Sequence, residues 1–374
     1  MSRIQRLFTL STLFIASTAL LAEPDQVATR QEGPLPPNES RAALAETADA
    51  VPEVNVFFAT NRQRKKVDKP GVRFGGKRGE PAFGTCTVEF EPIPGMEEVA
   101  QKVPFYVPTE SRVLGIEIEA DPDLFWKRLA STVEATESGD VVVFIHGYSY
   151  DLERGCDRAA QAQRVLDGEA TLLLFTWPSN GRATDYASDR KDLEWSVPFL
   201  MTVLRELVDR FGAENVQVLA HSLGSRGIVE ALMGLKNEGM GEPLMNQLVL
   251  LAPDIGSARF LEALPDLRSL TGDITLYASS NDTPLKFSRQ VNRSPRLGQA
   301  GDFLTVAEGM ETVDVTPAGR YQYLGHEYFY FHPLVVADLL ELVTTRSGAA
   351  ERAAPRPRSL NGLAYWEIVA EATD

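Results

Sequence analysis

The sequence predicts an α/β fold with a mostly parallel central sheet and helices on both faces. Three observations support this prediction. The chain has 374 residues, of which 44% are hydrophobic, so it can bury a large core. In its central part, short apolar runs alternate with longer helical stretches. Those runs contain no polar alternation, which is typical of parallel strands covered on both faces.

The first 22 residues have the pattern of a secretory signal peptide. Two arginines precede an apolar run, and acidic, proline-rich sequence follows. This order predicts cleavage near Ala19 or Ala22 and export to the periplasm or cell envelope, or secretion. The alternative is an uncleaved membrane anchor, because the run is only slightly shorter than the roughly 20 residues that span a bilayer.

Charge limits the partners of the protein. Lys and Arg number 37 against 52 Asp and Glu, a net charge of -15. The resulting field repels phosphate backbones and anionic lipids. We therefore expect no nucleic-acid partner, and membrane contact only through an uncleaved N-terminal segment. The sequence indicates no oligomeric state.

The α/β domain is expected over residues 52–346. A flexible linker at 23–51, rich in Ala, Pro, Glu and Thr, precedes it. Residues 347–374 are expected to form a flexible C-terminal tail, whose end either docks back through Tyr365 and Trp366 or frays.

The elements of the domain are predicted in order along the chain. Three strands come first, at 54–58, 83–92 and 113–121, followed by a helix at 122–139. Strands at 140–146, 171–177, 215–222, 247–254 and 273–282 then alternate with helices at 152–166, 189–212, 223–238 and 283–292. Pro198 should kink or split the second of these helices. A last strand at 310–319 and a helix from Pro333 complete the domain.

Parallel strands joined by right-handed crossovers end at one edge of the sheet, where open α/β sheets carry their sites. The candidates at this edge are therefore the residues that close the strands. They are His146, Gly147, Trp177, Ser222, Asp254 and Asp282.

The segment "LAHSLG" predicts a sharp strand-to-helix turn around Ser222. Small neighbours permit such a turn, and the turn exposes the serine hydroxyl as a nucleophile. The alternative is a serine that only caps the following helix, since serine is favoured at that position.

A serine nucleophile needs a base, and the chain has four histidines. His221 adjoins the serine and is expected to pack beside the turn. His146 precedes a glycine, where its backbone should matter more than its ring. His326 is favoured over His332 because the preceding glycine leaves its loop free to aim the ring. His332, just before a helix, is expected to be a surface or capping residue.

The acid that orients the base should end a strand between the serine and the histidine. Asp254 and Asp282 both fit, and Asp282 is favoured because it follows the strand nearest His326. Asp254 is then expected to cap a helix or to lie behind the site. The oxyanion that forms on attack would be met by the backbone N–H groups of Leu223 and Tyr148.

Several segments resemble the α/β-hydrolase superfamily: "VVVFIHGYSY", "LAHSLGS", "LLAPDI", "YASSNDTPL" and "GHEYFYF". With "FFATNR" and "FTWPS", they are similar to the bacterial DUF900 family over residues 54–345. The resemblance implies that Ser222 is the nucleophile, Asp282 the acid and His326 the base. Members of this family are described as esterase- or lipase-like. One departure is Ala220, where glycine is commoner.

The predicted activity is hydrolysis of a small-molecule or lipid carboxylic ester through an acyl-serine. Thioester or peptide cleavage would use the same groups. A non-catalytic binding protein of the cell envelope is the alternative class. No metal or nucleotide cofactor is expected, because ligand-spaced histidines and a phosphate-binding loop are absent from the sequence.

Several features remain open at this stage. Cys86 and Cys156 either pair in an oxidising compartment or stay as buried thiols. Residues 293–311 form either a mobile lid or a simple connection. Four aromatic residues are candidate pocket walls or core residues, namely Tyr148, Trp177, Tyr186 and Phe287.

Overall fold

The computed structural model describes residues 53–65, 73–92, 109–182, 184–320 and 324–370. The expected signal peptide (1–22) and linker (23–51) lie outside the described residues. Among the described residues, no helix combines the length and the apolar character needed to cross a membrane.

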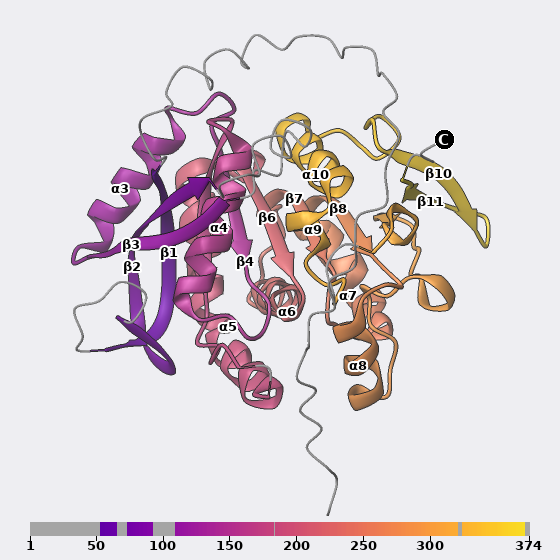
Figure 1. Cartoon of the computed structure of the whole chain (residues 1–374), viewed down its shortest axis with the longest axis horizontal. Coiled ribbons are helices and arrows are strands. Elements are labelled where there is room, and N and C mark those ends of the chain that lie inside the picture. Colours follow the sequence, from indigo (N-terminus) through magenta and orange to yellow (C-terminus); the bar gives the residue numbers. More distant parts are fainter. Residues whose placement is uncertain (1–52, 66–72, 93–108, 183, 321–323, 371–374) are drawn as a thin grey trace, which may run out of the picture. The chain divides into compact units, whose positions relative to one another are not determined.

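Eleven strands of the described chain form one sheet, in the order β10-β11-β9-β8-β7-β6-β4-β5-β1-β2-β3 (Figure 1). Their bounds are β1 (Glu53–Arg64), β2 (Phe74–Pro92), β3 (Thr109–Glu119), β4 (Asp140–Ile145), β5 (Ala170–Thr176), β6 (Val216–His221), β7 (Met245–Leu251), β8 (Thr271–Ala278), β9 (Glu311–Asp314), β10 (Pro355–Leu360) and β11 (Leu363–Ile368). All neighbours from β1 through β5, β4, β6, β7, β8 and β9 to β11 are parallel. Only β1–β2, β2–β3 and β10–β11 pair antiparallel. The predicted fold class, a mostly parallel sheet of the α/β-hydrolase type, is confirmed.

Helices cover both faces of the sheet because successive strand residues point to opposite sides. In β4, Val141, Val143 and Ile145 join one apolar cluster, and Val142 and Phe144 join another. The first cluster includes residues of α3 (Pro122–Val133), α5 (Tyr186–Phe211), α6 (Leu223–Asn237) and α7 (Ser257–Leu270). The second includes residues of α4 (Leu152–Leu166), α8 (Thr283–Asn292), α9 (Tyr328–Phe331) and α10 (Pro333–Thr345).

Of the two expectations for Pro198 in helix α5, a kink or a split, the split is wrong. The helix runs from Tyr186 to Phe211 with Pro198 inside it, so the proline does not split the helix.

The expected flexible tail is wrong for residues 355–368, which form the hairpin β10–β11. Asn361 and Gly362 both have positive φ (51° and 83°), the backbone that a tight two-residue hairpin turn requires. Strand β11 then adds to β9 with Trp366 opposite Val313. Of the two alternatives for this segment, docking is the one observed.

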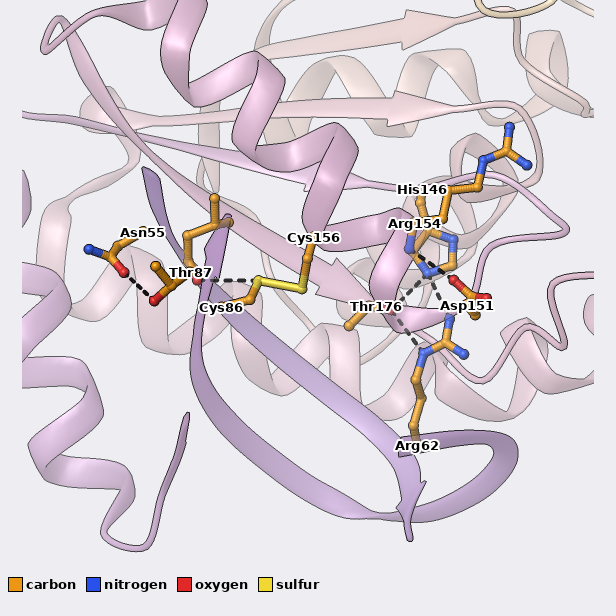
Figure 2. Close-up of a disulfide and its surroundings, with 10 residues drawn as sticks. Asn55, Arg62, Cys86, Thr87, His146, Asp151, Arg154, Cys156 and Thr176 are labelled. Carbon is orange, nitrogen blue, oxygen red and sulfur yellow. Dashed lines mark hydrogen bonds between the residues drawn. A yellow bond between two sulfur atoms is a disulfide. The ribbon is translucent and has the colours of Figure 1, made fainter. Parts of the chain in front are cut away.

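Cys86 of β2 and Cys156 of α4 form a disulfide, which settles the alternative left open by the sequence (Figure 2). Both cysteines are fully buried, and they are 70 residues apart in the chain. The bond therefore fixes α4 to the antiparallel strands at one side of the sheet.

Candidate active site

Ser222 lies in a strained turn between β6 and α6. Its φ is +52°, which is uncommon for a residue with a side chain. A Cβ at Gly224 would lie 2.5 Å from the carbonyl oxygen of His146, so only glycine fits there. The Ser222 side chain makes no capping hydrogen bond to α6. The alternative of a serine that satisfies the helix donors is therefore not what the structure has.

Backbone hydrogen bonds fix this turn from the neighbouring strand. The N–H of Ser222 donates to the carbonyl of Leu251 (2.9 Å), at the end of β7. The N–H of Asp254 donates to the carbonyl of Ser222 (2.9 Å). Both the N–H and the carbonyl of Ser222 are thus hydrogen-bonded to the β7 end of the chain.

The expected acid and base meet in the structure. Nδ1 of His326 lies 2.6 Å from Oδ2 of Asp282. The other oxygen of Asp282 accepts the N–H of Leu285 (2.8 Å) at the start of α8. Gly325 makes this meeting possible: its φ is +64°, and a Cβ there would lie 2.6 Å from the carbonyl of Asn281.

Asp282 and His326 each influence the pKa of the other. Burial raises the pKa of Asp282, and the facing imidazole only partly offsets this. Burial alone would lower the pKa of His326, but the Asp282 carboxylate, with smaller contributions from Glu327 and Asp254, outweighs it, so the pKa of His326 is raised above its usual value. Asp282 therefore makes His326 a stronger base while fixing its ring.

The second ring nitrogen of His326, Nε2, takes no part in the contact with Asp282. It is buried and has no hydrogen-bond partner among the described residues. The ring lies 4.7 Å from the ring of His221, the residue directly before Ser222. The structure thus brings the imidazole beside the turn that carries Ser222.

His221 packs between aromatic rings, as expected. Its ring lies 4.6 Å from Phe329 and 6.3 Å from Tyr150, between centroids. Burial holds the pKa of His221 well below its usual range, so its ring stays neutral beside His326.

The two expected oxyanion donors, Leu223 and Tyr148, belong to segments that adjoin Ser222. Leu223 is the first residue of α6, where N–H groups lack helical partners. Tyr148 follows Gly147, where an added Cβ would lie 2.9 Å from Cβ of Ser222. Neither N–H donates to the backbone of another described residue.

The loop at residues 146–151 carries Tyr148, one of the two expected oxyanion donors, and we name it the oxyanion loop after that expectation. It is held by Asp189, a residue that was not predicted from the sequence. Its carboxylate accepts the N–H of Ser149 (3.0 Å), the hydroxyl of Ser179 (2.5 Å) and the N–H of Asn180 (3.1 Å). Burial raises the pKa of Asp189, and these hydrogen bonds oppose the rise.

Arg62 of β1 was also missed, although "FFATNR" carries it. It is 1% exposed and donates to the carbonyls of Ser179 (2.7 Å) and Tyr150 (2.8 Å) and to the hydroxyl of Thr176 (2.9 Å; Figure 2). Burial lowers the pKa of Arg62 to about 9. The signal in the sequence was a charged residue shortly after a run of apolar strand residues, which indicates a buried charge with specific partners.

The ring of His146 matters more than expected. It lies 2.7 Å from the carbonyl of Gly147 and 3.0 Å from the hydroxyl of Thr176. It also stacks between Tyr150 (5.2 Å) and Trp177 (5.0 Å). Burial keeps the pKa of His146 well below its usual range, so a neutral ring supports the oxyanion loop.

Asp254 lies behind the turn and contacts no histidine in the described structure. Its carboxylate accepts the hydroxyls of Tyr186 (2.8 Å) and Ser288 (2.6 Å), and Nη1 of Arg296 lies 3.5 Å away. Of the two roles left open for it, helix capping is wrong, because α7 has Gly256 at its N-cap.

Other predicted features have clear positions. Trp177 is fully buried against His146 and is a core residue, whereas Phe287 is 64% exposed and faces outward. The rings of Tyr148 and Tyr186 pack edge to face, 5.5 Å apart. His332 is buried, with Nε2 2.9 Å from the carbonyl of Ala318, so of its two expected roles the surface position is wrong. It does occupy the N-cap position of α10, without a side-chain capping hydrogen bond.

Residues 293–311 form a connection rather than a free lid. The N–H groups of Leu297 and Gly298 donate to the carbonyls of Ile255 (2.9 Å) and Pro253 (3.0 Å). Among the described residues, no group of three or more metal-binding side chains could hold a metal ion.

Comparison with known proteins identifies the family. The model of the family described as alpha/beta hydrolase of unknown function (DUF900) matches residues 122–346, more than half of the chain. The chain belongs to this family. The matched residues include Ser222, Asp282, His326 and the oxyanion loop.

Individual similarities are more distant. The uncharacterized protein alr1448 of Nostoc sp. (strain PCC 7120) is 33% identical over 73 residues, which cover 20% of this chain and 19% of that relative's length. Among solved structures, the carboxylesterase EstE1 from a metagenomic library is 11% identical (TM-score 0.34), covering 82% of this chain and 93% of that one. An esterase from Pyrobaculum calidifontis is 11% identical (TM-score 0.30), covering 68% and 99%.

Proposed function

We propose that this hydrolase-family protein cleaves carboxylic esters through an acyl-serine intermediate on Ser222. The observation that carries the proposal is the 2.6 Å contact between His326 and Asp282 beside the strained serine turn. The other imidazole nitrogen is buried and has no hydrogen-bond partner in the part of the chain that the structure describes. A serine, a base and an acid in this order are the parts that nucleophilic acyl transfer requires.

Each residue has a defined step in the proposed reaction. Ser222 Oγ attacks the ester carbonyl carbon while its proton passes to Nε2 of His326. The N–H groups of Leu223 and Tyr148 stabilise the oxyanion. The intermediate then collapses, and the leaving alcohol takes the proton from His326. Water attacks the acyl-serine in the same way, which releases the acid and restores the hydroxyl.

A panel of p-nitrophenyl esters of increasing acyl length tests this proposal. Wild type should hydrolyse one or more of them, and Ser222→Ala and His326→Ala should each lose at least about 10³-fold in kcat. Equal hydrolysis by wild type and Ser222→Ala would contradict the proposal. A folded wild type inactive on every ester would favour the binding-protein alternative, and cleavage of thioesters or peptides alone would change the substrate class.

The disulfide supports an extracytoplasmic location. Disulfides persist in oxidising compartments such as the bacterial periplasm and are rare in the cytosol. The buried bond between Cys86 and Cys156 is therefore consistent with the export expected from residues 1–22. Mass analysis of the mature chain from cell fractions would test both the compartment and the cleavage.

A further inference from the structure

We propose that Glu327 is a positioning residue that fixes the base His326 to the oxyanion loop and to α4. The inference rests on the proposed function and adds a residue that the expected site does not include. Glu327 directly follows the base, but its side chain points to different partners from those of His326.

The carboxylate of Glu327 has three partners from outside its own loop. Oε1 accepts the hydroxyl of Tyr150 (2.5 Å) and Nη2 of Arg154 (2.7 Å). Oε2 lies 3.4 Å from Nη2 of Arg158. The side chains of Glu327 (12% exposed) and Arg158 (16%) are largely shielded from water, whereas that of Arg154 is 42% exposed, so the contacts with Tyr150 and Arg158 are the better protected ones.

Through Tyr150, Glu327 connects the base with the oxyanion loop. Tyr150 is two residues after Tyr148, the proposed oxyanion donor, and its own carbonyl accepts Arg62 (2.8 Å). The guanidinium of Arg154 lies 4.4 Å from the Tyr150 ring centroid. Displacing Glu327 would therefore loosen the base relative to the groups that stabilise the oxyanion.

Through its arginines, Glu327 connects the base with α4. Arg154 and Arg158 are four residues apart, so they lie on one face of the helix. Cys156 lies between them in sequence and points away from that face to the disulfide with Cys86 (Figure 2). Helix α4, whose two arginines contact Glu327, is thus itself covalently fixed to the sheet.

The negative charge of Glu327 also affects the pKa of the base His326. Burial lowers the pKa of His326, Asp282 raises it most, and Glu327 raises it further. The pKa of Glu327 itself is lowered, because its two arginines outweigh the effect of burial, so it is ionised at neutral pH. A residue that only stabilised the fold would leave the titration of the base unchanged.

The test compares Glu327→Gln with a matched control. Glu230 accepts Nε of Arg226 (2.8 Å) and Nη2 of Arg259 (3.1 Å) and has a similarly exposed side chain (16%), but it lies two turns along α6 from the serine. With p-nitrophenyl butyrate, Glu327→Gln should lower kcat about 10- to 100-fold with little change in KM. The acid limb of kcat/KM should move to lower pH, and Glu230→Gln should behave like wild type.

Further measurements keep the inference falsifiable. Tyr150→Phe removes one hydroxyl and should lower kcat in the same direction by a smaller factor, and Glu327→Asp should recover part of the loss. A wild-type kcat and pH profile in Glu327→Gln, with only a lower melting temperature, would overturn the inference and leave the proposed function intact. A folded wild type that neither hydrolyses esters nor reacts with a fluorophosphonate would overturn the proposed function, and the inference with it.

Discussion

Replacing Gly147 by alanine should damage catalysis far more than it damages the fold. A Cβ at this position would lie 2.9 Å from Cβ of Ser222, 2.9 Å from Nδ1 of His221 and 3.2 Å from Cε1 of the same ring. Carbon atoms in contact are normally about 3.5–4.0 Å apart, so the loop must retreat by roughly 0.6 Å or more. The N–H of Tyr148 would retreat with it.

The size of the effect follows from what that N–H does. Loss of one oxyanion donor lowers kcat by about 10²- to 10³-fold. Overpacking of this kind destabilises a protein by about 1–3 kcal/mol. Gly147→Ala should therefore fold, melt at a somewhat lower temperature and hydrolyse p-nitrophenyl butyrate at least about 100-fold more slowly than wild type.

Gly115→Ala is the matched control, because nothing lies within 4 Å of a Cβ at that position in β3. It should keep wild-type kcat and melting temperature. The assay is steady-state hydrolysis with thermal melting on the same samples. A wild-type kcat for Gly147→Ala would refute the placement of the oxyanion site beside this glycine.

Three further predictions concern the base, the disulfide and the buried arginine. Because the pKa of His326 is raised and only its neutral ring accepts a proton, kcat/KM should fall as pH decreases, with a midpoint above the usual histidine value of about 6.5. Asp282→Asn should move that midpoint to lower pH and reduce kcat by up to about 10⁴-fold. Replacing Cys86 and Cys156 by serine opens a link across 70 residues and should lower the free energy of unfolding by roughly 4 kcal/mol, measured by urea denaturation. Arg62→Met leaves buried carbonyls unbonded and should cost about 3 kcal/mol or more, with a lower kcat.

Each of these predictions has a result that would contradict it. A pH profile that is flat from pH 5 to 8, or a midpoint unmoved by Asp282→Asn, would remove His326 from the reaction. An unchanged urea midpoint in the double serine variant would show that the disulfide does not stabilise the native chain, and an unchanged midpoint in Arg62→Met would show the same for the buried arginine. Leu124→Ser, at an exposed position on α3, serves as a control for changes in handling and expression.

The sequence was most informative where local pattern and topology agree. Unbroken apolar strands predict a parallel sheet, and a parallel sheet brings its strand ends to one edge. That is why Ser222 and Asp282 could be placed near each other across 60 residues of chain. The glycine before His326 likewise indicated a loop free to reach them, and its φ and close approach to Asn281 show why it is required.

Other features could not be predicted, because they depend on contacts between distant segments. Arg62 lies in the first strand of the domain, and the carbonyls that accept its hydrogen bonds lie more than 80 residues away in the chain. Glu327 looks like a surface residue until α4 brings Arg154 beside it. The C-terminal hairpin was missed for a different reason: the local turn signal at Asn361 and Gly362 was present but stood among prolines and arginines typical of a tail.

The most direct test of the account is covalent labelling of the full chain with a fluorophosphonate, followed by peptide mass analysis. An activated serine should carry the phosphonyl group at Ser222 in wild type, slowly or not at all in His326→Ala, and nowhere in Ser222→Ala. Wild-type labelling at a different residue, or equal labelling rates with and without the imidazole of His326, would contradict it.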